Sequence, residues 1–420
     1  MVGDMRALGV AFVLVLLAAC SSGGGEDVRD GSTPEEVPPA TSHTEADSDT
    51  PSEVLPPRDS SSDLPSCGTE KAFFSVSPVA LSDFMGIVPL GNLAPSGHVF
   101  PTDHVYFHIN RIDRSQWELG TVEVPVVSPG DVWVTEIRST GSERGTDYGI
   151  RFFPCDEVEA FFIHVSTLTG ELEESFREPY DECNEYSTGG SNYKNCWKTV
   201  NVKLSAGELI GTAGGGQEQN ALDLGVYDLR VDPQPYANPD RWGEQLLHVV
   251  CPLDYFTADV RDALRAKLGS HDGTTSRAGP VACGEVEQDE PGTAQGVWIL
   301  PGTVYTYPED PHLSLVHDNV DPSTGVFSVG VSMADSGLSS GLYHFDPASS
   351  GLVNRDFKDV TADGAIYCYE TRDRFGSEPL PFVILVQLTS PTTLRSERQD
   401  SASCGSGPWQ FSSAYTDYER

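Results

Sequence analysis

The chain has few basic residues and no long apolar segment. Its 420 residues include 26 Lys and Arg against 63 Asp and Glu, which gives a formal net charge of -37. This charge argues against binding to nucleic acids or to anionic lipid headgroups. The N-terminal apolar run, residues 8–19, is too short to cross a bilayer as a helix and is typical of a secretion signal.

Several common functional motifs are also missing. No C-x-x-C spacing occurs, which argues against zinc knuckles and a thioredoxin motif. The glycines at 214–216 are not followed by the Lys-Ser/Thr of a phosphate-binding loop. The acidic segment 318–325 lacks the final Glu of an EF-hand, so we expect a β-turn there rather than a calcium site.

The N-terminal apolar run ends in Leu17-Ala18-Ala19-Cys20, which resembles a bacterial lipobox. The resemblance implies cleavage before Cys20 and lipidation of its thiol, so that acyl chains anchor the protein to the cell envelope. Ser21 after the cysteine favours the outer membrane, on either its periplasmic or its surface side. An ordinary secretory signal that happens to end near a cysteine is the alternative.

Composition divides the rest of the chain. Residues 21–66 are rich in Pro, Ser, Thr, Asp and Glu and almost free of aromatics, which predicts a disordered acidic tether after the signal at 1–20. The body that follows is long enough for more than one domain. We expect a first β domain over 67–250, a helix and connection over 251–291, and a second β-rich domain over 292–420.

Short apolar runs separated by Gly, Pro, Asp and Asn predict a mostly β fold. Examples are Val105-Tyr106-Phe107, Phe161-Phe162-Ile163 and Phe382-Val383-Ile384. One short helix is expected between the two β domains, with Thr257 as its N-cap and an apolar stripe of Val260, Leu264 and Leu268 before Gly269.

Cysteine usage agrees with export. Removing lipidated Cys20 from the nine cysteines leaves eight disulfide candidates: Cys67, Cys155, Cys183, Cys196, Cys251, Cys283, Cys368 and Cys404. An even number in an oxidising compartment indicates disulfides. The spacing does not fix the pairing, but closing local loops favours Cys183–Cys196, Cys251–Cys283 and Cys368–Cys404, which leaves Cys67 with Cys155.

Four segments follow one another in the order of a known set of motifs. Gly97-His98 to Asp103 resembles an H-x-x-x-D motif, and residues 126–134 resemble the strand-turn-strand after it. The run Phe162-Ile163-His164-Val165-Ser166 resembles a Y-x-H-L-S strand, and residues 204–215 resemble a glycine-rich hairpin. Together, residues 85–230 resemble the lysostaphin-like zinc endopeptidases, which have the duplicated hybrid motif fold, and the resemblance implies a peptidase-like β domain.

The resemblance implies a zinc site that is incomplete here. His98 and Asp103 take the positions of two metal ligands, although one extra residue separates them, and His164 takes the position of a catalytic histidine. The family's H-x-H strand becomes Asp223-Leu224-Gly225, so Asp223 replaces a catalytic histidine and Gly225 replaces the third ligand. Catalytic zinc needs three protein ligands and a water, so the cofactor is either absent or a zinc ion held differently.

Two functions follow as hypotheses. The first is a non-catalytic binding or regulatory module that contacts peptidoglycan or an envelope protein. The second is an active zinc endopeptidase with a rearranged site of His98, Asp103, Asp223 and His104. Simpler roles compete for these residues: His104 and His108 as packed strand residues, His164 as a core residue, and Asp103 as a turn residue.

Aromatic residues of the C-terminal part admit two interpretations. They could line a sugar-stacking groove, but aromatics in β-sheets more often belong to the core. The residues concerned are Trp298, Tyr305, Tyr307, Tyr343 and Phe345.

Overall fold

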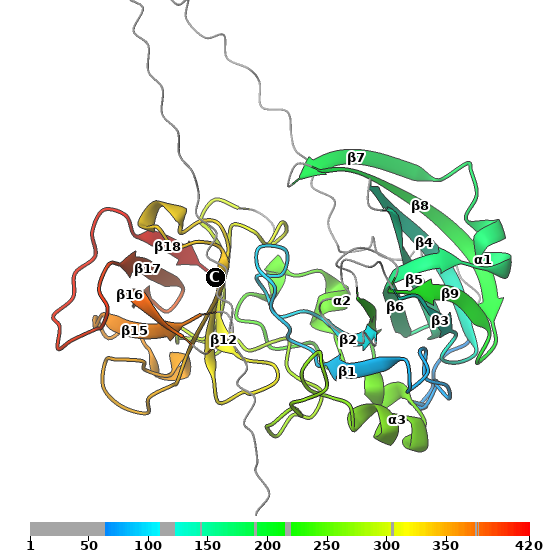
Figure 1. Ribbon diagram of the computed structural model, residues 1–420, viewed down its shortest axis with the longest axis horizontal. Helices are drawn as coiled ribbons and strands as arrows, with labels where there is room; N and C mark the ends of the chain where they lie inside the picture. The colour runs from blue at the N-terminus through cyan, green and yellow to red at the C-terminus, as the bar shows by residue number, and fades with distance from the viewer. Residues whose placement is uncertain are drawn as a thin grey trace, which may run out of the picture. The chain divides into compact units, whose positions relative to one another are not determined.

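Antiparallel β-strands dominate the computed structural model of this protein (Figure 1). The structure describes residues 64–109, 122–142, 145–188, 191–214, 220–303, 306–373, 376 and 378–420. The predicted signal, Cys20 and nearly all of the predicted tether lie outside these residues. The mostly β fold that the sequence predicts is confirmed by these strands. The lipid anchor stays a prediction.

The first sheet contains ten strands within the described residues. They are β1 Phe84–Val88, β2 His104–Ile109, β3 Val124–Val127, β4 Val132–Ser142, β5 Gly145–Cys155, β6 Val158–Leu168, β7 Glu182–Thr188, β8 Ser191–Leu204, β9 Leu209–Ala213 and β10 Ala221–Asp228. The main path runs β1-β2-β10-β6-β5-β4-β8-β7, and β9 joins β3 to β6. Strand β10 therefore lies between β2 and β6, which brings together segments more than 100 residues apart.

The second sheet is an eight-stranded meander in chain order. Its strands are β11 Gly296–Trp298, β12 Leu313–His317, β13 Gly325–Val329, β14 Gly341–Phe345, β15 Tyr367–Arg372, β16 Pro379–Ser390, β17 Thr393–Gln399 and β18 Thr416–Glu419. Trp298 and Phe345 are fully buried in its core. The core interpretation is confirmed for these two residues, and the sugar-groove interpretation is wrong for them; Tyr305 lies outside the described residues.

Helices are few and short. The α-helices are α1 Gly170–Ser175, α2 Glu244–Leu247 and α3 Ala258–Arg265, and the 3-10 turns span Pro239–Arg241, Pro252–Tyr255, Ala334–Ser336 and Phe357–Asp359. Helix α3 begins after Thr257 as expected and buries Leu264, but it ends at Arg265, before Leu268. The sequence did not indicate α1 or α2. No helix among the described residues is long and apolar enough to cross a membrane.

Residue alternation gives the first sheet one apolar and one polar face. On β2 and β10 the fully buried residues Phe107, Leu222 and Leu224 belong to the large hydrophobic core of this sheet. Their strand neighbours, which include His104 and Asp223, point to the opposite face because successive side chains alternate across a strand. The polar face of β2, β10 and β6 carries the residues that the sequence singled out.

Four disulfides link the eight cysteines: Cys67–Cys155, Cys183–Cys196, Cys251–Cys283 and Cys368–Cys404. This is the pairing that the sequence favoured. Disulfides persist in oxidising compartments, so the four bonds are consistent with an exported protein.

Direct contacts join the two sheets, which belong to one compact unit. The backbone N–H of Phe100 donates to the buried carboxylate of Glu309 at 2.8 Å, and the Phe100 ring stacks on His312. The Asn319 side chain donates to the Pro89 carbonyl at 2.8 Å. Asn319 lies in the acidic segment 318–325, where Asp318 accepts two backbone N–H groups, so the expected turn is confirmed.

Candidate functional site

The centre of the candidate site is the carboxylate of Asp223, which lies between two imidazole rings. Its Oδ2 is 3.4 Å from Nε2 of His104 on β2 and 3.2 Å from Nε2 of His164 on β6. Asp223 is 1% exposed and His104 is 4% exposed. Adjacent strands supply the three side chains, because β10 pairs with β2 on one side and with β6 on the other.

Carboxylates also hold the outer nitrogens of both rings. Nδ1 of His164 lies 2.7 Å from Asp147 of β5, and Nδ1 of His104 lies 2.8 Å from Asp103. The Tyr227 hydroxyl donates to the other oxygen of Asp103. We call this continuous set the His–Asp chain: Asp147, His164, Asp223, His104, Asp103 and Tyr227.

Electrostatics within the His–Asp chain favour protonated imidazoles. Burial opposes the charge of His164, but Asp223 and Asp147 outweigh it and raise the pKa of His164 to about 10. Burial also opposes the charge of His104, yet Tyr106, Asp103 and Asp223 raise its pKa well above the ordinary value. The pKa of Asp223 falls despite burial, because the two imidazoles stabilise its ionised form.

His108, the next histidine on this face of β2, behaves in the opposite way. Burial and the neighbouring His271 lower its pKa to about 4, so it is neutral at physiological pH. Its ring lies against Tyr106 and His271 and makes none of the contacts that define the His–Asp chain. This is the packed role that the sequence offered as an alternative for His108.

An unusual backbone conformation places His164 in the site. Its φ of 68° lies in the left-handed region, which non-glycine residues seldom adopt. Strict alternation along β6 would put His164 on the core face with Phe162, and the irregular pairing of β5 with β6 near Val165 marks the break. Strain of this kind often marks functional sites.

The zinc position implied by the peptidase resemblance does not fit these residues. Both oxygens of Asp103 are engaged, one by His104 and one by Tyr227, so Asp103 is committed to the His–Asp chain. A Cβ atom at Gly225 would lie 2.1 Å from Cζ of Phe161. The aromatic ring of Phe161 therefore fills the place where the third ligand would project.

His98 lies next to the His–Asp chain. It lies in a turn closed by two backbone hydrogen bonds with Ala94, and its ring meets that of His104 edge to face, with centroids 5.9 Å apart. The structure thus places His98 beside His104, while Asp103 faces His104 and Tyr227.

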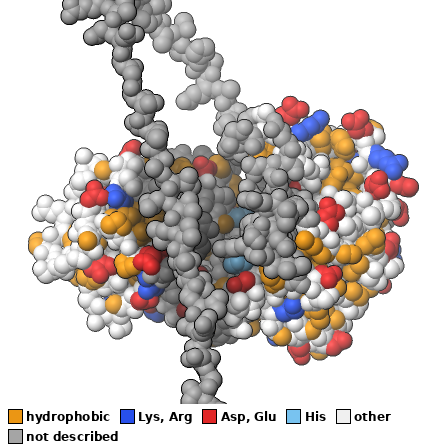
Figure 2. All heavy atoms as spheres, in the orientation of Figure 1, with side chains coloured by type: hydrophobic (Ala, Val, Ile, Leu, Met, Phe, Trp, Pro, Cys, Tyr) orange, Lys and Arg blue, Asp and Glu red, His pale blue; other side chains and the backbone are white. Residues whose placement is uncertain are grey.

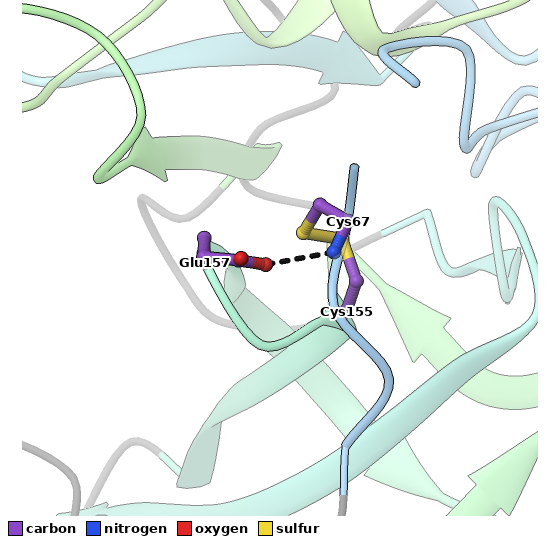
Figure 3. A group of neighbouring side chains, drawn as sticks. All are labelled: Cys67, Cys155 and Glu157. Carbon is purple, nitrogen blue, oxygen red and sulfur yellow. Dashed lines mark hydrogen bonds between the residues drawn. A yellow bond between two sulfur atoms is a disulfide. The ribbon is translucent and has the colours of Figure 1, made fainter. Parts of the chain in front are cut away.

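One group of three His, Cys, Asp or Glu residues in the described part of the chain has ligand atoms within 4.8 Å of one another. It consists of Cys67, Cys155 and Glu157 (Figure 3). The two sulfurs form a disulfide, and the Glu157 carboxylate accepts the backbone N–H of Cys67 at 2.7 Å. Metal binding requires thiolates, so this group is a structural link and not a metal site.

A small cavity of about 50 Å³ adjoins Asp103 and His104 on the polar face. It has room for a few water molecules or for one charged group of a larger ligand. Charged residues of β4, β5 and β6 line it together with aromatic rings, and the list includes Glu136, Arg138, Arg151, Glu159, Phe161 and Tyr307. The cavity wall thus carries charges of both signs.

Acidic side chains do not gather into a single patch on the face drawn in Figure 2. There, Asp and Glu side chains are scattered over the surface with Lys and Arg among them.

Sequence reasoning identified His104, His164, Asp223 and Asp103 but missed two members of the His–Asp chain. Tyr227 could have been found, because it shares the strand face of Asp223 and Gly225. Asp147 lies in none of the sequence motifs. Only the pairing of β5 with β6 brings it next to His164. No family model matches the chain, and neither a curated protein nor a solved structure matches it.

Proposed function

We propose that this protein is an exported lipoprotein, anchored through Cys20, that binds peptidoglycan at the cell envelope without cleaving it. The lipobox resemblance supports the anchor, and the four disulfides are consistent with export. The peptidase resemblance of residues 85–230 supports an envelope target, although analogy of fold is a weak warrant for function.

The observation that carries the proposal is the aromatic ring at the third ligand position. Phe161 is 5% exposed and packs over Gly225, where a zinc ligand of the peptidase family would stand. With Asp103 also engaged, the family position does not retain the three protein ligands that hydrolytic zinc needs. The endopeptidase alternative has no comparable observation in its favour.

The cavity wall supports a binding role. Arg151 and Glu159 lie 3.1 Å apart and nearly buried, and Glu136 and Arg138 project from the neighbouring part of the same face. Peptidoglycan stem peptides carry both carboxylates and ammonium groups, so a cavity wall with charges of both signs suits them. The net charge of -37 argues against nucleic acid as the partner.

Co-sedimentation with insoluble peptidoglycan tests the proposal. We expect the full chain, with its disulfides intact, to sediment with the polymer and to release no soluble peptide. Arg138→Ala should weaken sedimentation. Arg372→Ala is the matched control, because Arg372 pairs with Asp346 in the second sheet, and it should sediment like the parent chain. Release of soluble fragments would contradict the binding role.

A further inference from the structure

We propose that His104, His164 and Asp223 form a binding site for one divalent transition-metal ion of the zinc class. The site is displaced from the position that the peptidase resemblance implies, and it uses neither His98 nor Asp103 as a ligand. The inference goes beyond the proposed function and does not depend on it.

The donor atoms converge from three adjacent strands. Both Nε2 atoms face the same Asp223 oxygen, at 3.4 and 3.2 Å. Ligand atoms bound to one tetrahedral zinc at about 2.0–2.1 Å lie about 3.3–3.5 Å from each other. Each nitrogen–oxygen separation therefore already matches one edge of the coordination polyhedron, and two imidazoles with one carboxylate are a known zinc donor set.

The surroundings of the imidazoles are those of metal ligands. A metal-bound histidine usually donates its other ring N–H to a carboxylate or carbonyl, which fixes the tautomer and aims the free nitrogen at the ion. Asp103 does this for His104 at 2.8 Å, and Asp147 does it for His164 at 2.7 Å. Both rings thus carry the outer carboxylate that such a site requires.

Two buried atoms at the centre of the site are poorly satisfied. Oδ1 of Asp223 has no hydrogen-bond partner within the described residues, and Nε2 of His104 has only the 3.4 Å ion-pair contact with Oδ2 of Asp223. Leaving such atoms unsatisfied costs about 1–3 kcal/mol each. The carboxylates Asp103, Asp147 and Asp223 also favour a cation here: a bound dication would release the Nε2 protons of the two imidazoles to solvent and take over their positive charge.

One separation must close on binding. The two Nε2 atoms lie more than 4.8 Å apart, because the three residues do not form a group whose ligand atoms are all within that distance. His164 is the ligand able to move: its side chain is 18% exposed, compared with 5% for His104. Its left-handed backbone is a strained state that a ligand contact would help to maintain.

Metal titration of the full chain tests the site. We expect one Zn²⁺ per chain after dialysis, and Co²⁺ in its place should give visible absorption bands. His104→Gln and His164→Gln should each weaken binding at least about 100-fold, and Asp147→Asn about 10- to 100-fold. The Asp147 side chain is 28% exposed, so this variant is expected to fold. His108→Gln, on the strand face of His104, is the control and should leave affinity unchanged.

The outcomes separate this inference from the proposed function. One equivalent of zinc, weakened by His164→Gln and Asp147→Asn but not by His108→Gln, supports the site. No bound zinc or cobalt, or binding that both variants leave unchanged, overturns it while the proposed function stands. Release of peptide from peptidoglycan by the zinc-loaded chain supports the site and overturns the proposed function.

Discussion

Replacing Gly225 by alanine should destabilise the protein more than such a small change would elsewhere in the sheet. The added Cβ would lie 2.1 and 2.2 Å from Cζ and Cε1 of Phe161. Phe161 is 5% exposed and packs near Tyr227 and His104, so its ring has little room to retreat. Overpacking of this kind costs about 1–3 kcal/mol of unfolding free energy.

A double-mutant cycle measures the contact directly. Phe161→Ala alone should cost about 3–5 kcal/mol, because it empties a buried aromatic site. In the double variant the new methyl group enters that space, so its destabilisation should be smaller than the sum by about 1–3 kcal/mol. Denaturant titration of the parent, both single variants and the double variant gives the four free energies.

Gly149→Ala on β5 is the matched control. Its Cβ would meet no atom closer than 3.7 Å, so the substitution should cost far less than Gly225→Ala. Equal costs at the two glycines, or additive effects in the cycle, would refute the conclusion that Phe161 occupies the third ligand position.

Two further predictions concern stability. Burial, and after it the charge of Asp289, raises the pKa of Glu287 from 4.5 to about 7. Ionisation of Glu287 should therefore lower the unfolding free energy as the pH rises through that interval, by at most about 3 kcal/mol. Glu287→Gln should therefore raise the melting temperature at pH 8 but not at pH 4, and a gain that is the same at both values would contradict this. The Cys67–Cys155 bond spans 88 residues and the Cys183–Cys196 bond spans 13. Because a longer loop restricts the unfolded chain more, replacing both cysteines by Ala should lower the unfolding free energy by about 4–5 kcal/mol for the first bond and about 3 kcal/mol for the second. Denaturant titration that gives the reverse order would refute this entropic ranking.

The strand pattern of the site could be predicted from local sequence. Alternation puts His104 on one face of β2 and puts Asp223 together with Gly225 on one face of β10, although the pairing of these two strands is known only from the structure. The period of two is a property of the backbone, so a short apolar run reveals it without knowledge of the fold.

The chemistry of the site depends on contacts that local sequence does not encode. The ring of Phe161 covers Gly225 because β6 pairs with β10 in the register Gly225↔Phe161. His164 reaches the polar face because its backbone is left-handed, and the run Phe162-Ile163-His164-Val165 does not predict this conformation. Both features are set by pairing between distant segments, so motif alignment found the residues but not their partners.

The His–Asp chain gives a physical reason why His164 and Asp223 need not be remnants of a lost catalytic centre. An isolated buried carboxylate would cost several kcal/mol to desolvate, yet Asp223 is 1% exposed and ionised between two imidazoles. Each imidazole is in turn held by an outer carboxylate, and the outermost groups, Asp147 and Tyr227, lie on separate strands. Removing any inner member of the His–Asp chain leaves a buried charge without its partner. The polar face therefore needs its histidines and acids for stability, whether or not the protein cleaves its target.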